Sequence, residues 1–265
     1  MRALFYDRRY ARWTAWLVPL LLLLAWEVLV DGQVIAVRVL PAPSRVLTAL
    51  LRLLRSGELL THLSVSFQRA VLGFVLGGGA GLALGFVTGL SRVGEVLLDT
   101  PIQMIRNVPH LALVPIVILW FGIGEESKVF LVALGALFPM YVNTYHGIRS
   151  VDPGLLELGT IYQVDRRRIF TDVVLPGALP SILVGVRYAL GLTWLSLIVA
   201  ETLAARAGLG FMAMNAREFL ETDVVVLSIV LYALLGKAAD SVARLLERRL
   251  LAWHPTQRAT ARGAA

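Results

Sequence analysis

The chain has 265 residues and contains no cysteine. Without cysteine it can form no disulfide, no thiolate metal site and no cysteine nucleophile. Charged residues are also scarce, at 16% of the chain, whereas soluble domains carry about 25%. Hydrophobic residues make up 57%. This composition predicts a polytopic membrane protein, and no polar interval is long enough to form a separate soluble domain.

Motifs for nucleotide or metal chemistry are missing from the sequence as well. No G-x-x-x-x-G-K-[ST] loop occurs, so the chain is not expected to hydrolyse ATP itself. The four histidines are scattered without metal-ligand spacing, and we expect no metal site and no bound cofactor. No nucleophile and base converge in any segment, so we do not expect an enzyme.

The formal net charge of +7 would suit nucleic acid, but the basic residues stand at the ends of apolar segments. This placement is typical of membrane proteins, in which lysine and arginine accumulate on the cytoplasmic side. We therefore expect membrane lipid around the chain and no nucleic acid.

Six apolar segments are predicted to cross the bilayer as helices, which makes the fold all-α. They lie at about residues 15–30, 63–90, 95–121, 129–148, 180–203 and 224–246. The first is read as an uncleaved span rather than a signal peptide, because no cleavage motif follows Val30. The chain would then be one domain, 14–248, between a cytoplasmic amino end, 1–13, and a cytoplasmic tail, 249–265.

Glycine recurs at every fourth residue of the second span: Gly73, Gly77, Gly81, Gly85 and Gly89. Such a ridge lets another helix approach closely in lipid. Packing within the chain is favoured over a seam between two copies.

Three prolines interrupt the third span: Pro101, Pro109 and Pro115. They free backbone carbonyls that only a cavity, water or neighbouring protein can satisfy. Arg106, Asn107 and His110 cluster between the first two, and an ionisable residue at membrane depth is a candidate for a transport pathway or gate. The alternative is that Arg106 simply pairs with Asp99.

Two further polar residues are candidates for the pathway or gate. Asn143 lies near the inner end of the fourth span, and Glu201 lies late in the fifth.

The longest polar interval, 149–180, holds three consecutive arginines, Arg166, Arg167 and Arg168. Each would cost roughly 3 kcal/mol at the centre of a bilayer, so this insert must face water, on the cytoplasmic side. Asp152-Pro153-Gly154 predicts a helix start, and apolar residues recur at helical spacing as far as Ile169. Pro176 and Pro180 are expected to stop that helix and open the next one.

The insert resembles the cytoplasmic loop of ABC-importer permeases of type I, the binding-protein-dependent class. In that loop E-A-A is followed by three residues and a glycine, then by nine residues and I-x-L-P. Glu157-Leu158-Gly159 takes the place of E-A-A, Gln163 takes the glycine position, and Leu175-Pro176 matches the end. The runs 106–123, 141–149 and 213–226 resemble the aliphatic-sulfonate branch, and the resemblance covers nearly all of the chain beyond the first dozen residues.

The resemblance implies a permease subunit of the bacterial inner membrane, with both termini cytoplasmic. It would pair with a second copy of itself, with two copies of an ABC ATPase that carries ATP-Mg, and with a periplasmic or lipid-anchored substrate-binding protein. The insert helix, about 154–169, would be a coupling helix seated on the ATPase. Its implied contact residues are Glu157, Leu158, Gly159, Tyr162, Arg166, Arg167, Arg168, Leu175 and Pro176.

In the last external loop Asn215, Arg217 and Glu218 become candidates for docking of the binding protein. The implied cargo is an aliphatic sulfonate, with taurine, nitrate or a vitamin precursor as alternatives. A secondary transporter is disfavoured, since the two halves show no internal repeat. As an alternative, the three arginines would only keep the insert on the cytoplasmic side by their positive charge and would contact no partner.

Overall fold

The computed structural model describes residues 8–253, and their regular structure is helical throughout. Side chains are described from Leu17 onward, apart from that of Ala204. The helices are α1 (Arg8–Asp31), α2 (Pro43–Arg55), α3 (Glu58–Leu90), α4 (Arg92–Gly94), α5 (Thr100–Arg106), α6 (Val114–Phe121), α7 (Glu125–Arg149), α8 (Pro153–Ile161), α9 (Arg166–Ile169), α10 (Leu175–Ala204), α11 (Leu209–Glu218) and α12 (Thr222–Leu250). Two π-helical segments, Glu95–Asp99 and Phe170–Val174, and a 3-10 segment, His110–Leu113, join some of them.

Four continuous helical stretches in this range are long and apolar enough to cross a membrane: Glu58–Leu90, Glu125–Arg149, Arg166–Leu203 and Thr222–Leu250. Arg92–Arg106 and His110–Phe121, bent by 81° to one another, would make a fifth if the pair is one span. The predicted first span, 15–30, falls within α1, where the side chains before Leu17 lie outside the described residues. The all-helical membrane fold is confirmed.

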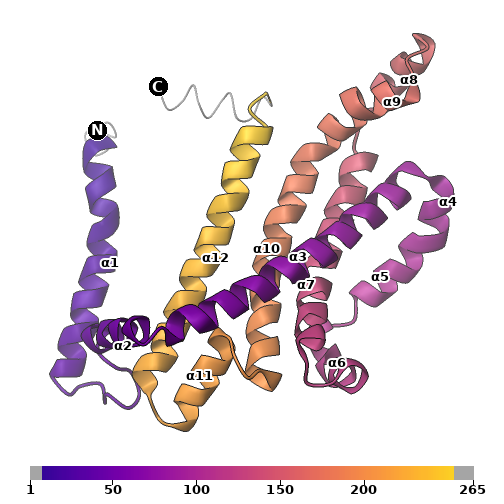
Figure 1. The fold of residues 1–265 in the computed structure, drawn as a ribbon. Coiled ribbons are helices and arrows are strands. Elements are labelled where there is room, and N and C mark those ends of the chain that lie inside the picture. The colour runs from indigo at the N-terminus through magenta and orange to yellow at the C-terminus, as the bar shows by residue number, and fades with distance from the viewer. Residues whose placement is uncertain (1–7, 254–265) are drawn as a thin grey trace.

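The centre of the bundle is α7, which packs against α3 and against α10, while α12 packs against α10 (Figure 1). The glycine ridge of α3 faces α7. A Cβ added at Gly77 would overlap the backbone of Ala133, and one at Gly81 would overlap that of Leu137. The close approach predicted from the ridge is therefore made within the chain. Because glycine has no side chain, the backbones of α3 and α7 come into direct contact.

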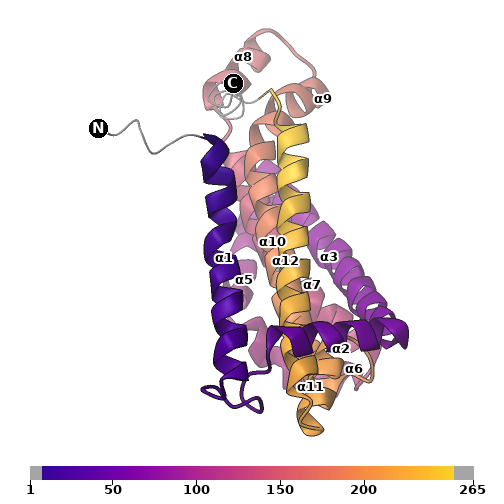
Figure 2. The ribbon, with the colours of Figure 1, turned by 90° about the vertical axis from the view of Figure 1, so that its left-hand side faces the viewer.

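An amphipathic helix, α2, lies across the end of the bundle (Figure 2). Its apolar residues Val46, Ala49 and Leu53 are buried against α11 and α12. Pro43 occupies its first turn, where no intrahelical donor is lost. The remaining long helix, α1, packs against α2 and stands apart from the other spans (Figures 1 and 2).

The third predicted span is broken at one proline rather than three. Pro109 lies at the bend, whereas Pro101 and Pro115 sit in the first turns of α5 and α6. Before Pro101 the helix widens into the π-helical segment Glu95–Asp99. Such a widened turn accommodates the missing N–H and the ring of the proline, so the helix continues.

A π-helical segment also precedes Pro176, and the expectation that Pro176 and Pro180 stop one helix and open the next is wrong. They do not separate two helices, because Arg166–Leu203 is continuous. The π-helical segment Phe170–Val174 ends just before Pro176, and Pro180 lies inside α10. The expected single insert helix, about 154–169, is also wrong: α8 ends at Ile161 and α9 begins at Arg166.

Candidate functional site

The insert projects beyond the bundle at one end, which we call the insert end (Figure 1). Its helix begins where the sequence predicts. The Asp152 side chain accepts a hydrogen bond of 2.9 Å from the backbone N–H of Gly154, and Pro153 fills the first helical position. This combination satisfies a free donor and presets the backbone for a helix.

Most of α8 has no protein covering it. Leu155 and Leu158 are each 49% exposed, Ile161 is 73% exposed and Tyr162 is 78% exposed. Glu157 is exposed between them. An apolar surface on a polar insert outside the bundle marks a place where another protein can bind.

Two residues of the insert explain why α8 and α9 fold against each other. A Cβ on Gly159 would stand 3.1 Å from the Ile169 side chain, so the absence of a side chain lets Ile169 approach. Gln163 has a φ of 52°, in the left-handed region, and reverses the chain between the two helices. The glycine position of the resembled loop is thus the residue at which the backbone requires a positive φ.

The three arginines make up most of α9 and are exposed. Arg166 and Arg167 line a groove of about 620 Å³ with Leu90 and Phe170. The other two predicted coupling residues, Leu175 and Pro176, are half-buried at the start of α10. They therefore belong to the packed base of the insert rather than to its open surface.

The bend in the third span holds Arg106 and Asn107, both exposed, and the half-buried His110. The alternative in which Arg106 pairs with Asp99 is wrong: within the described residues Arg106 has no ion pair. Asp99 instead accepts a hydrogen bond of 2.7 Å from the Tyr141 hydroxyl. His110 Nε2 lies 2.9 Å from the Ser196 hydroxyl, which ties the bend to α10.

Asn143 packs between α7 and α10. Its Nδ2 donates to the carbonyl of Pro139 at 2.9 Å, and its backbone carbonyl accepts from Ser181 of α10 at 2.7 Å. A Cβ on Gly185 would meet the Asn143 side chain at 2.8 Å. These contacts give Asn143 a packing role, and they leave its amide little freedom to bind a solute.

Glu201 is 1% exposed and fully paired. Its carboxylate accepts from Arg69 at 2.7 Å and from the Ser66 hydroxyl at 2.8 Å. The Gly210 N–H, at 2.9 Å, and the Tyr232 hydroxyl, at 3.1 Å, donate to its other oxygen. A carboxylate with this many donors is held as a buried structural group rather than offered to a passing solute.

The predicted docking residues Asn215, Arg217 and Glu218 do come together. All three are exposed on α11, at the end of the bundle opposite the insert (Figure 1). Phe219 and Leu220, 71% and 84% exposed, follow directly. Exposed charged side chains at the end of a short helix, followed directly by exposed apolar side chains, suit protein docking.

The sequence matches a known family over most of its length. The family model described as the binding-protein-dependent transport system inner membrane component matches residues 73–252. The chain belongs to this family. As such an inner membrane component, the permease is a multi-pass membrane protein.

Among similar curated proteins, the "Putative aliphatic sulfonates transport permease protein SsuC" of Escherichia coli (strain K12) is 58% identical to the permease, over 91% of each chain. The Bacillus subtilis (strain 168) protein of the same name is 45% identical, over 93% of the permease and 89% of that protein. The taurine transport system permease protein TauC of Escherichia coli (strain K12) is 35% identical, over 96% and 98%.

Solved structures share the fold. A chain of an amino acid ABC transporter crystallised with histidines superimposes with a TM-score of 0.61 at 20% identity, covering 76% of the permease and 97% of that chain. A chain of the inward-facing MetNI methionine ABC transporter gives 0.52 at 20% identity, covering 75% and 98%.

Arg69 was missed by sequence reasoning, although it is an arginine within the second span. It is 3% exposed and donates to Glu125 at 2.6 and 2.7 Å, to Glu201 at 2.7 Å and to the Ala207 carbonyl at 2.6 Å. Lys128 lies 3.3 Å from Glu125. We call this set of two cations and two carboxylates the Arg69 network; it carries no net charge and joins α3, α7 and α10.

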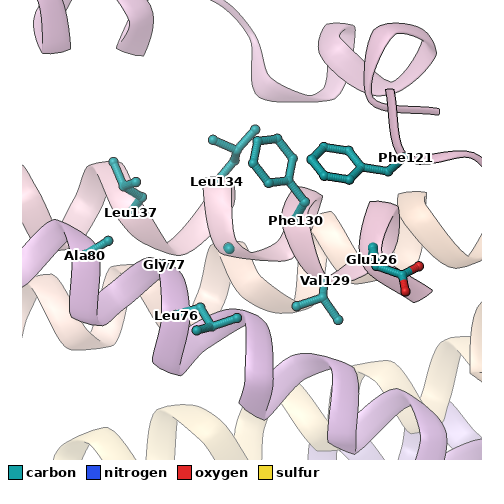
Figure 3. A pocket seen from close by; sticks show the side chains of 10 residues that line it. Leu76, Gly77, Ala80, Phe121, Glu126, Val129, Phe130, Leu134 and Leu137 are labelled. Atoms are coloured by element: carbon teal, nitrogen blue, oxygen red, sulfur yellow. The ribbon is translucent and has the colours of Figure 1, made fainter. Parts of the chain in front are cut away.

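An apolar groove of about 370 Å³ lies between α3 and α7 and is closed by Phe121 of α6 (Figure 3). The rings of Phe121 and Phe130 lie 5.0 Å apart, and Glu126 supplies the one charge in the lining. No basic side chain lines this groove, so it offers no site for an anion. Across residues 8–253 no group of three or more His, Asp or Glu side chains could hold a metal ion.

Proposed function

We propose that the permease is the membrane subunit of an ATP-driven importer for aliphatic sulfonates. The observation that carries this proposal is the 58% identity over 91% of both chains with the Escherichia coli protein named for that transport. The match runs over 240 residues, so it takes in the insert and the connecting loops as well as the spanning helices. Two copies of the permease would form the translocation pathway, since paired identical chains are the commonest closed assembly.

The energy would come from a partner ATPase seated on the insert. In support, α8 offers exposed Leu155 and Leu158 with Glu157 between them, Tyr162 is exposed directly after α8, and α9 offers three exposed arginines. The apolar face would fill a groove on the ATPase, as amphipathic helices do, and the charges would fix its register. Closing of the ATPase pair on ATP would move both inserts and bias the spans between two arrangements.

The insert end would face the cytoplasm, and the α11 end would receive the binding protein. The first turn of α1 and the last turn of α12 lie at the insert end in both views (Figures 1 and 2). Both termini would accordingly be cytoplasmic, as the excess of basic residues on that side favours.

The test is uptake of radiolabelled alkanesulfonates by cells lacking their own sulfonate importers. The permease would be expressed with its ATPase and binding protein. We expect vanadate-sensitive uptake of alkanesulfonate, with weak or no uptake of taurine and nitrate. Uptake of taurine without uptake of alkanesulfonate would show that taurine, and not an alkanesulfonate, is the cargo. Uptake that persists without the ATPase would contradict the importer itself and favour a secondary transporter.

A further inference from the structure

The groove of about 620 Å³ beside the arginines of α9 lies where α3 ends, at the insert end (Figure 1). One wall is Leu90, the last residue of α3. The other wall comes from the start of the continuous helix Arg166–Leu203 and consists of Arg166, Arg167, Ile169, Phe170, Thr171 and Val174. We call it the α3–α9 groove. It combines apolar walls with two cations.

The charge of the α3–α9 groove is positive and unpaired. Its lining includes Arg166 and Arg167 and no carboxylate. Both arginines are exposed, and in the described part of the chain neither forms an ion pair. The nearby carboxylate of Asp172 accepts a hydrogen bond of 2.8 Å from the Thr171 hydroxyl instead. Two guanidinium groups therefore keep free donors for an oxyanion from outside the chain.

The floor of the α3–α9 groove is held by packing between helices. The Phe170 ring lies edge-on to Phe86 of α3, with 5.9 Å between the ring centres. Val174 is 7% exposed and belongs to the same buried cluster as Ile148 of α7. Leu90, by contrast, is 52% exposed at the rim. The groove is thus a formed feature of the bundle that opens to its surroundings.

The α3–α9 groove lies where spanning helices meet water. Leu90 ends the apolar stretch Glu58–Leu90, and the exposed Arg92 follows shortly after it. At this level of a spanning helix the acyl chains of the bilayer give way to the head groups. No residue of α8, which carries the exposed apolar side chains proposed to bind the ATPase, lines the groove. The groove therefore suits lipid better than it suits the ATPase.

We propose that the α3–α9 groove binds an anionic phospholipid. The lipid phosphate would accept hydrogen bonds from Arg166 and Arg167, and one acyl chain would lie against Leu90 and Phe170. Basic pockets between spans on the cytoplasmic side do bind such head groups. Arg168, which does not line the groove, is left to contact the ATPase. The choice of the cytoplasmic leaflet rests on the proposed orientation, whereas the binding itself does not depend on the proposed cargo.

The experiment is native mass spectrometry of the permease–ATPase complex in detergent, titrated with phosphatidylglycerol or with phosphatidylcholine. We expect wild type to bind phosphatidylglycerol more tightly than phosphatidylcholine, which has no net charge. Arg166→Gln and Arg167→Gln should each weaken the binding of phosphatidylglycerol about fivefold, as loss of one cation near an anionic head group would. Arg168→Gln is the matched control from the same run and should bind phosphatidylglycerol as wild type does.

A second pair of variants tests the apolar part of the groove. Thr171→Trp places a large side chain in the groove without changing the charge, so it should weaken the binding of phosphatidylglycerol while the ATPase stays bound. Thr61→Trp makes the same change at an exposed threonine at the other end of α3 and should bind phosphatidylglycerol as wild type does.

The same spectra report how many copies of the permease and the ATPase remain together. Equal affinity of wild type for the two lipids, or unchanged binding of phosphatidylglycerol by Arg166→Gln, Arg167→Gln and Thr171→Trp, would overturn the lipid site. If the arginine variants instead shed the ATPase or the second copy while phosphatidylglycerol binds as before, the groove is a protein interface and the lipid site is likewise overturned. Selective binding of phosphatidylglycerol without any import of alkanesulfonate would leave the lipid site standing and sink the proposed cargo.

Discussion

The Arg69 guanidinium is one of three deeply buried charges among the described residues, at 3% exposure beside Glu201 at 1% and Lys128 at 3%. Three of its nitrogens donate to Glu125, Glu201 and the Ala207 carbonyl. Removing one partner of a buried ion pair leaves the other charge without compensation and costs about 3–5 kcal/mol. The Arg69 network is therefore stabilising only as a whole.

We expect Arg69→Met to lower the Tm of the purified permease by roughly 10 °C, because Glu201 would remain buried and charged. Arg92→Met, at an exposed arginine after α3, should leave the Tm unchanged. The double variant Arg69→Met/Glu201→Gln should lose less than the sum of the single variants, since the sites are coupled. Additive losses would show that the network does not act as a unit.

Gln163 carries local strain that a glycine would not. A residue with a side chain in the left-handed region costs about 1–2 kcal/mol. We expect Gln163→Gly to keep the protection of the α8 amides in hydrogen exchange, while Gln163→Val should speed their exchange because a β-branched residue resists positive φ. Equal exchange in both variants would mean that this turn does not hold α8 against α9.

The helices of the permease differ in how well the sequence predicts where they begin and end. Asp152 and Pro153 fix the start of α8 locally, and its predicted start is right. Its end was predicted too late, because the left-handed turn at Gln163 gives no hydrophobic signal. The sequence also failed to predict that the helix continues through Pro176, since this continuation depends on the widened π-helical segment Phe170–Val174 directly before α10.

A substitution on the exposed surface of the insert should change partner binding without disturbing the fold of the helix bundle. Glu157 is exposed on α8, so Glu157→Arg should leave the fold intact and abolish copurification of the ATPase. Glu218→Arg makes the same reversal on exposed α11 and should leave the ATPase bound. Retention of the ATPase by both variants would remove α8 as its binding site.

The whole molecule presents two different ends, one with α8 and α9 and the other with α2 and α11 (Figure 1). Between them, α3, α7 and α10 are joined by backbone contact at the glycines and by the Arg69 network. A movement imposed at the insert would therefore reach the opposite end through packed helices rather than through a flexible chain.

Charge reversal on α11 should impair the response to the binding protein and spare ATPase binding, whereas charge reversal on α8 should abolish ATPase binding. We expect Arg217→Glu to keep the ATPase bound while lowering the stimulation of ATP hydrolysis by the binding protein about tenfold, as a reversed interface charge disfavours docking. Arg38→Glu, an exposed arginine between α1 and α2 at the same end, should have little effect. Full stimulation of the Arg217→Glu variant would assign docking elsewhere.

Hydropathy and charge along the chain were enough to predict an all-helical membrane fold, because the bilayer acts on both residue by residue. The spacing of the glycines also predicted the face of α3 that packs closely, since residues four apart lie on the same face of a helix. Only the tertiary structure decided the partner of each charge. Arg69 and Glu201 are separated by 132 residues and touch solely because α3 and α10 pack together, whereas Arg187 stays partly open beside Asp240.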